Sequence, residues 1–291
     1  MGIRYDYYDF DVDSLIDTNV YGFDLAANSG TESDDIVSLK ASIAYAFSNN
    51  LEGYVSIGEG FHSNDARGTT TVVDPVDGAS IKPVDPLVES LGYEFGFRQV
   101  INQQINISAA LWYLELDSEL LFVGDAGNTE ASRASERKGL ELTAYYRINE
   151  TWTADLEYAF SKANFTEDDS NSPTLGDHIP GAVEDVIQLG ISANFKAGYY
   201  GSFRLRYFGE EPLEESGRIK GDSALIANLL LAKDWKDYGV KIEVLNVFDS
   251  NDRDVEYYYE SQLASETSPV EDVHYKIFEP RSFRLSAHWF F

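Results

Sequence analysis

Cysteine is absent from this chain of 291 residues, and basic side chains are scarce. The lack of cysteine is compatible with passage through an oxidising compartment, although many cytosolic proteins share it. Only 22 Lys and Arg stand against 50 Asp and Glu, giving a formal net charge of −28. Such a surface repels phosphate backbones, so no nucleic-acid partner is expected. No run of about 18 apolar residues occurs, and the sequence predicts no membrane-spanning helix.

Motifs that carry catalysis are also missing. The four histidines are scattered along the chain, and neither an HExxH zinc motif, a phosphate-binding loop, a dinucleotide glycine fingerprint nor a G-x-S-x-G elbow is present. We therefore expect no enzyme activity, no catalytic or metal-binding residue and no cofactor. A Ser-His-Asp triad is defined by geometry, so residue types alone leave a barrel hydrolase open.

Alternation of apolar and polar side chains is what the sequence does contain. In the last nine residues one face of an extended strand would carry Phe283, Leu285, Ala287, Trp289 and Phe291. This period of two is typical of a wall between lipid and water. A strand of about 9–11 residues is long enough to cross a hydrocarbon layer.

The same alternation recurs in other segments of similar length. With the last one, they are 2–10, 36–47, 51–60, 88–99, 104–116, 139–148, 152–161, 184–197, 198–209, 222–233, 237–248 and 283–291. They predict an all-β fold, an antiparallel transmembrane β-barrel segment of about twelve strands.

The connections between these segments alternate between short and long. The short ones are 48–50, 102–103, 149–150, 197–198 and 234–237, and the long ones are 11–35, 61–87, 117–134, 163–183, 210–221 and 249–280. Outer-membrane barrels have short periplasmic turns and long extracellular loops. Both chain ends are therefore expected on the periplasmic side.

Acidic residues are concentrated in the long connections. Residues 11–35 contain seven acids and no Lys or Arg. These loops can be acidic for solubility at the cell exterior, or they can select cationic or metal-bearing ligands, calcium included. The acids of 249–256 match a calcium-loop spacing only loosely, so we interpret them as ordinary loop acids.

Four motifs resemble those of TonB-dependent receptors. In chain order they are 135–141 (SERKGLE), 179–182 (IPGA), 244–249 (VLNVFD) and 279–284 (EPRSFR). Two further segments, 60–68 (GFHSNDARG) and 120–127 (LLFVGDAG), resemble those of one subgroup. Each motif alone is weak, but their order and spacing match across essentially the whole chain.

The resemblance implies a barrel of about 22 strands, plugged by an amino-terminal domain. Such receptors take up scarce large nutrients, for example ferric siderophores, with energy from the inner membrane. We expect residues 1–291 to supply about half of these strands and to include no plug, TonB box or signal peptide. We therefore expect 1–291 to be the carboxy-terminal part of a receptor barrel in the outer membrane of a Gram-negative bacterium.

The expected partners are outer-membrane lipid, a small-molecule or metal-chelate ligand, and the TonB complex through the missing amino-terminal part. The alternative is an independent twelve-stranded outer-membrane pore or barrel enzyme. An upstream plug would favour the receptor, and a signal peptide directly before residue 1 would favour the alternative.

Two loop segments, 61–68 and 253–260, combine aromatic, basic and hydrogen-bonding side chains that suit a bulky polar ligand. The candidate ligand-binding residues are His62, Asp65, Arg67, Arg253, Tyr257 and Tyr259. The tyrosines can equally extend an aromatic girdle at the membrane interface.

Overall fold

A computed structural model describes residues 1–75, 77–118, 120–123, 128–166 and 176–289. Twelve strands form one antiparallel sheet: β1 (Gly2–Val12), β2 (Gly30–Ser48), β3 (Leu51–Ser63), β4 (Leu87–Ile101), β5 (Ile105–Leu116), β8 (Ser135–Arg147), β9 (Trp152–Phe165), β10 (Asp185–Phe195), β11 (Tyr199–Phe208), β12 (Ala224–Asp234), β13 (Tyr238–Leu245) and β16 (Ser282–Trp289). Two hairpins stand outside it, β6 (Leu120–Val123) with β7 (Asn128–Ala131) and β14 (Arg253–Ser261) with β15 (Val270–Ile277). Short 3₁₀ turns are η1 (Ala26–Asn28), η2 (Ala66–Thr69) and η3 (Lys196–Gly198).

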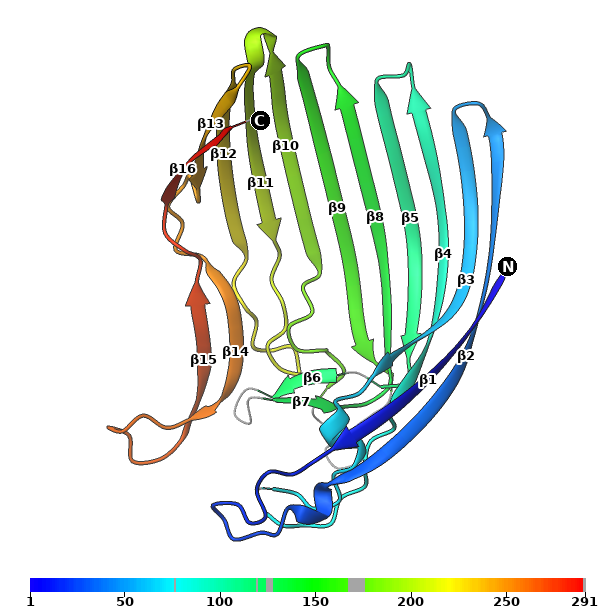
Figure 1. Ribbon diagram of the computed structural model, residues 1–291, viewed down its shortest axis with the longest axis vertical. Helices are drawn as coiled ribbons and strands as arrows, with labels where there is room; N and C mark the ends of the chain where they lie inside the picture. Colours follow the sequence, from blue (N-terminus) through cyan, green and yellow to red (C-terminus); the bar gives the residue numbers. More distant parts are fainter. Residues whose placement is uncertain (76, 119, 124–127, 167–175, 290–291) are drawn as a thin grey trace.

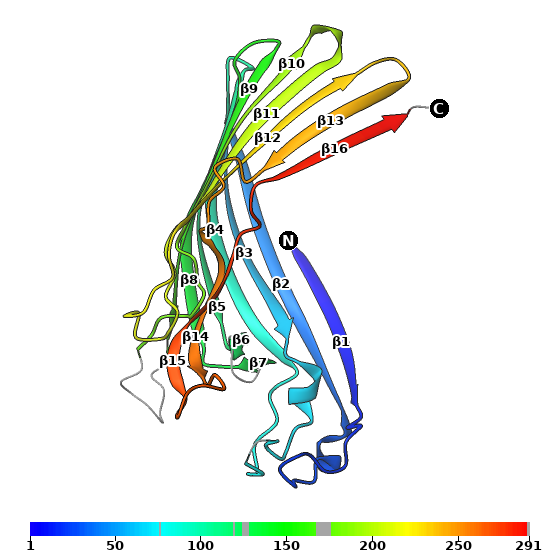
Figure 2. The ribbon, with the colours of Figure 1, turned by 90° about the vertical axis from the view of Figure 1, so that its left-hand side faces the viewer.

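The sheet curves into an open trough (Figures 1 and 2). Short turns join its strands at one end, and the long connections with both hairpins gather at the other. Each strand pairs with its neighbour in chain order, except that β5 pairs with β8 and β13 with β16. Within the described ladders β1 pairs only with β2 and β16 only with β13, so the trough has two edges.

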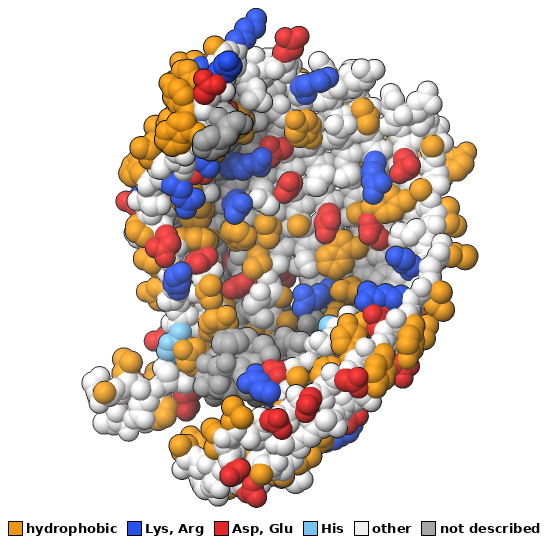
Figure 3. Space-filling view, in the orientation of Figure 1, with side chains coloured by type: hydrophobic (Ala, Val, Ile, Leu, Met, Phe, Trp, Pro, Cys, Tyr) orange, Lys and Arg blue, Asp and Glu red, His pale blue; other side chains and the backbone are white. Residues whose placement is uncertain are grey.

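Side chains alternate between the two faces of this sheet. Leu156, Leu189 and Leu205 are cross-strand neighbours on one face, whereas Asp155 and Arg204 lie on the other. Figure 3 shows charged side chains spread over the hollow face. Large apolar side chains on the opposite parity remain exposed, for example Ile43 at 76% and Leu285 at 74%. The convex face is therefore apolar and open, and the concave face is polar.

The predicted twelve strands and the strict alternation of turn lengths are confirmed. Several boundaries were wrong by two to six residues, and the largest error is at β2. This strand begins at Gly30, six residues earlier than predicted, because it pairs with β1 along that strand's whole length, Val12 opposite Gly30. Its first residues are acidic, which hid the alternation. Phe291, the predicted last residue of the final strand, lies outside the described residues.

Two connections predicted as plain loops contain hairpins. In 249–280, β14 pairs with β15 from Arg253 opposite Ile277 to Ser261 opposite Val270. In 117–134, β6 pairs with β7. The signal for the larger hairpin is its content of tyrosine, valine and isoleucine, which favour extended backbone.

The sheet has little core of its own, and the described buried apolar cluster lies at the loop end. Ala163 and Phe165, at the end of β9, pack with Ile179 of the 179–182 motif, which is 2% exposed. Gly181 takes a φ of 77°, and its N–H donates to the Pro212 carbonyl at 2.8 Å. This motif thus ties the β9–β10 connection to the β11–β12 connection. No helix of the described chain is long and apolar enough to cross a membrane.

Asn246 ends β13 three residues before the predicted boundary. Its φ of 49° lies in the left-handed region, which Asn tolerates better than most residues. The buried amide donates to the Ser250 carbonyl at 2.9 Å and the Glu279 carbonyl at 3.0 Å, and accepts from the Ser250 N–H at 3.0 Å. One side chain therefore joins the two ends of the β14–β15 excursion.

The motif at 279–284 completes this junction. The Arg281 N–H donates to Asp249 Oδ1 at 2.8 Å, and Arg281 Nε donates to the Val247 carbonyl at 3.0 Å. The two motifs that flank β14 and β15 therefore bind each other, which sets the entry of β16 beside β13.

Replacing Asn246 by Ala should lower the free energy of unfolding by about 2–4 kcal/mol, because the change leaves two backbone carbonyls without their donors. Urea unfolding followed by tryptophan fluorescence would measure this. Asn251→Ala is the matched control, because Asn251 is exposed. Equal stability of both variants would contradict the structural role of Asn246.

Candidate functional site

The concave face is lined by charges that are paired across strands. Arg204 Nη1 of β11 lies 2.7 Å from Asp155 Oδ2 of β9, reaching over β10. The intervening residue is Gly190, and a Cβ there would collide with the Asp155 carboxylate. Farther along, the Gln188 amide donates to Glu157 at 3.1 Å. Glycine therefore makes room for an ion pair on the trough floor.

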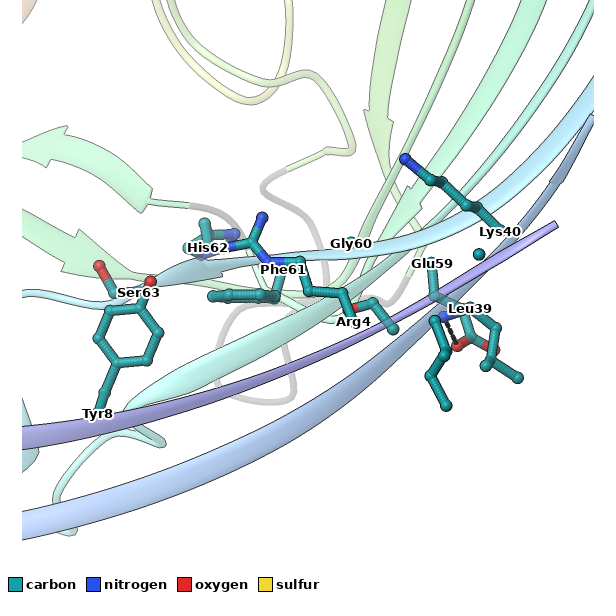
Figure 4. Close-up of a pocket in the computed structure, with 12 residues that line it drawn as sticks. Arg4, Tyr8, Leu39, Lys40, Glu59, Gly60, Phe61, His62 and Ser63 are labelled. Carbon is teal, nitrogen blue, oxygen red and sulfur yellow. Dashed lines mark hydrogen bonds between the residues drawn. The ribbon is translucent and has the colours of Figure 1, made fainter.

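At one side of the trough β2 parts from β3. Their ladder begins with Lys40 opposite Gly58, so residues 30–39 pair with β1 alone and residues 59–63 with β4 alone. A cavity of about 520 Å³ opens in this gap. Its side-chain lining includes Arg4 and Tyr8 of β1, Leu39 and Lys40 of β2, and Glu59, Phe61 and His62 of β3 (Figure 4).

Aromatic and charged groups meet inside this cavity. The Arg4 guanidinium lies 5.6 Å from the centroid of the Phe61 ring, and the Tyr8 ring meets Phe61 edge-on at 5.8 Å. Arg4 also pairs with Asp6 at 2.6 Å. The Glu59 carboxylate accepts from the Leu39 N–H at 2.8 Å, which satisfies a donor that the parted strands leave without a ladder partner.

His62, one of the predicted site residues, lines this cavity, but Asp65 and Arg67 lie beyond the end of β3. Asp65 caps η2 by accepting from the Arg67 N–H at 2.9 Å, and the Arg67 guanidinium returns to it at 3.0 Å. The hydrogen bond from Arg67 lowers the pKa of Asp65. The Arg67 side chain remains 71% exposed, so it is accessible to a ligand.

The second predicted group lies on β14. Arg253 binds Glu256 at 2.6 Å and Asp222 at 3.2 Å, and its guanidinium stacks 4.2 Å from the Tyr275 ring. The hydrogen bond to Glu256 raises the pKa of Arg253. This arginine therefore anchors the hairpin to the β11–β12 connection.

Tyr259 stacks on His274 with ring centroids 4.0 Å apart, and the His274 Nε2 atom is 3.2 Å from the Ser261 hydroxyl. Tyr257 lies opposite His274 in the ladder and is 41% exposed. The hairpin therefore offers an aromatic surface beyond the sheet.

The two predicted groups are not brought together. Figures 1 and 2 place the β14–β15 hairpin and η2 at different sides of the loop end. Connections from the middle strands lie between them. The ligand-contact roles of these residues stay predictions.

The acids of 249–256 serve local structure. Asp249 accepts from the Arg281 N–H, Asp252 from the Leu225 N–H at 2.8 Å, and Glu256 from the Asp222 N–H at 2.7 Å. Among the described residues no group of three or more His, Asp or Glu is placed to hold a metal ion.

Sequence reasoning missed an ion pair that joins two loops. Arg133 Nη2, before β8, lies 2.6 Å from Glu215 Oε2 of the β11–β12 connection, and its guanidinium stacks 4.1 Å from the Phe165 ring. Both charged side chains are largely buried, at 15% and 20% exposure. The partners are 82 residues apart, and no local pattern indicates such a pair.

Comparison with known proteins identifies a family and several solved structures with a similar fold. The sequence model of the TonB dependent receptor-like β-barrel matches residues 1–247. No curated protein matches the chain.

Solved structures share the fold at low identity. The ferric yersiniabactin uptake receptor FyuA from Yersinia pestis has 18% identity and a TM-score of 0.66, covering 91% of this chain and 39% of its own. The ferric-catecholate import receptor Fiu from E. coli K12 has 17% identity and a TM-score of 0.67, and the match covers 98% of this chain and 41% of Fiu. The copper transporter OprC has 16% identity and a TM-score of 0.69, and the match covers 99% of this chain and 44% of OprC. The chain thus spans about two fifths of each of these structures.

The loop contact near β14 should respond to pH through Glu211. Burial raises the pKa of Glu211, and the nearby charge of Glu256 adds to the effect. The folded form then holds the proton more tightly than the unfolded form, so the contact weakens as pH rises from the usual carboxyl pKa of about 4.3 through the raised value.

Replacing Glu211 by Gln should therefore slow amide hydrogen exchange at Gly221 and Asp222 at neutral pH, because the variant buries no charge there. The Gly221 N–H donates to the Glu211 carbonyl at 2.8 Å, which makes it a direct reporter. Exchange measured by mass spectrometry between pH 5 and 8 should show a flatter profile for the variant. An equal change in Glu210→Gln, whose side chain is 61% exposed, would rule out burial as the cause.

Proposed function

This chain belongs to the family of TonB-dependent receptor-like β-barrels, and we propose that it forms part of an outer-membrane receptor that takes up a scarce nutrient with energy supplied through TonB. The nutrient we propose is a ferric siderophore or another metal chelate. One observation carries the proposal: a twelve-stranded wall with an apolar convex face, a charged concave face and all long connections at one end.

Location in the outer membrane is supported by the exposed apolar surface. Side chains such as Ile43, Phe95 and Leu285 are each more than half exposed on the convex face. Burying apolar area is worth about 25 cal/mol per Å², so a surface of this extent favours contact with lipid over contact with water. Loops at the acidic end would then face the cell exterior.

The two sheet edges support a further part of the proposal, that these strands are the carboxy-terminal part of a larger barrel. Backbone groups at a free edge cost several kcal/mol each inside a bilayer, so β1 and β16 need partners there. The compared structures are more than twice as long as the segment that aligns with this chain. Additional strands of the same receptor would supply these partners.

Ligand contact is proposed for the loop residues His62, Asp65, Arg67, Arg253, Tyr257 and Tyr259. Arg67 and Tyr257 are the members most open to solvent, at 71% of the side chain and 41% of the residue. Arg253 and Tyr259 are held by neighbours, so they would position the hairpin surface.

Uptake is the test of the proposed function. Cells lacking the gene should lose accumulation of radiolabelled iron or copper supplied as at least one chelate from a panel, and the intact gene should restore it. Collapse of the proton gradient should abolish the restored uptake, because the energy comes from the inner membrane. Restored uptake that persists without the gradient would instead favour the passive pore.

Replacing Tyr257 and Tyr259 together, or Arg67 alone, should weaken chelate binding by about tenfold, as expected for losing one aromatic or charged contact. The amount of protein in the outer membrane should not change. Lys276→Gln, a hairpin residue with a 65% exposed side chain, is the control. Wild-type binding in all these variants would remove both loops from the site.

A further inference from the structure

The cavity between β1, β2 and β3 gathers cationic and aromatic groups in a chain with a net charge of −28. Arg4 and Lys40 line it with Phe61 and Tyr8 (Figure 4). Glu59 is the acidic side chain of the lining, and its carboxylate is already bound to the Leu39 N–H. The charged lining of this cavity therefore holds two cations and one acid, whereas acids outnumber cations in the chain as a whole.

Lys40 differs from the paired cations of the trough floor. Arg204 is held by Asp155 at 2.7 Å and Arg98 by Glu52 at 3.6 Å. Lys40 is exposed, and the described part of the chain places no carboxylate in an ion pair with it. An ammonium group without a carboxylate partner attracts an anion more strongly than a neutralised one.

Arg4 retains binding capacity despite its contact with Asp6. A guanidinium carries five N–H donors, and the Asp6 contact occupies Nη2 alone. The remaining donors are available to a second acceptor. In Figure 4 the heads of Arg4 and Lys40 both extend to the same side of the strands.

The Phe61 ring supplies an apolar wall next to the Arg4 guanidinium. It is contacted edge-on by Tyr8 and lies under the Arg4 guanidinium. A volume of about 520 Å³ exceeds what a single inorganic ion needs and lies within the range of small-molecule sites.

The geometry points to a subsite for an aromatic carboxylate. Its carboxylate binds on the side of Arg4 and Lys40, and its ring packs against Phe61 and Tyr8. This subsite rests on the proposed function in one respect, that the ligand reaches it through the trough of a receptor. Binding at equilibrium requires neither TonB nor a proton gradient.

Titration of the purified full-length protein in detergent with benzoate, benzyl alcohol and benzylammonium tests the sign of the charge. Benzoate should bind most tightly of the three. Lys40→Gln should weaken benzoate binding about tenfold, in keeping with the loss of one charge-assisted hydrogen bond. Arg206→Gln is the matched control, because Arg206 is an exposed cation of the concave face on β11, outside the cavity lining.

Phe61→Leu tests whether the ring of the ligand packs against Phe61. This variant should weaken benzoate binding and leave the weak binding of acetate unchanged, since acetate has no ring to pack. Lys40→Gln alters an exposed side chain and leaves the wall intact, so it tests the site even where Phe61→Leu fails to fold. Benzylammonium binding as tightly as benzoate, or equal benzoate affinity in Lys40→Gln and Arg206→Gln, would overturn the subsite.

The outcomes separate this subsite from the proposed function. Benzoate binding that depends on Lys40, in a protein that transports no chelate, would support the subsite and refute the receptor function. Chelate uptake in a protein whose benzoate binding ignores Lys40 would do the reverse.

Discussion

A wall in lipid must pair its backbone polar groups within itself, because hydrocarbon offers no hydrogen-bond partners. The ladder from β1 to β16 meets this constraint except at its two edge strands and where β2 parts from β3, and its side-chain pattern follows from it. In the outer-membrane setting proposed for this chain, every second side chain must suit lipid and the side chains between them must suit the trough. Small residues such as Gly190 stand where a charge pair reaches across a strand. The ligand recognition proposed for this chain is therefore confined to the concave face and to the loop end.

The ladder between β2 and β3 ends partway along the strands, and charged and aromatic side chains line the gap beyond it. Beyond Lys40 and Gly58 the two strands no longer pair, so backbone donors and side chains share one gap. A carboxylate takes the place of a ladder acceptor at Leu39. Rings and cations from three strands then line the cavity, a grouping that a closed ladder would keep on separate faces. The early end of the β2–β3 ladder thus makes room for the proposed subsite in an otherwise regularly paired sheet.

Period-two patterning made the twelve strands and the turn alternation predictable, since burial on one face alone fixes register. Boundaries failed where a strand is paired but not amphipathic, as at the acidic start of β2. The four receptor motifs were found in the sequence, yet the reason for two of them is tertiary: Asn246 and Arg281 bind across an excursion of more than thirty residues. The gap that holds His62 was not predictable, because Gly58 and Gly60 give no local sign that the ladder ends between them.

Scarcity of basic residues explains how the loop end is organised. With 22 Lys and Arg against 50 acids, each loop cation has several carboxylates in competition for it. Arg133, Arg253 and Arg67 are all engaged by acids. Arg133 and Arg253 each link two separate connections, whereas Arg67 binds Asp65 within the same turn. Carboxylates without such partners repel one another, so the loops are held by a few charged contacts and by buried groups such as Ile179. Loop order is therefore most sensitive to the loss of a basic residue, whereas the loss of an exposed acid relieves repulsion. A ligand that brings its own positive charge would meet the loop end favourably, whereas an anionic group finds its attraction inside, at the gap between β2 and β3.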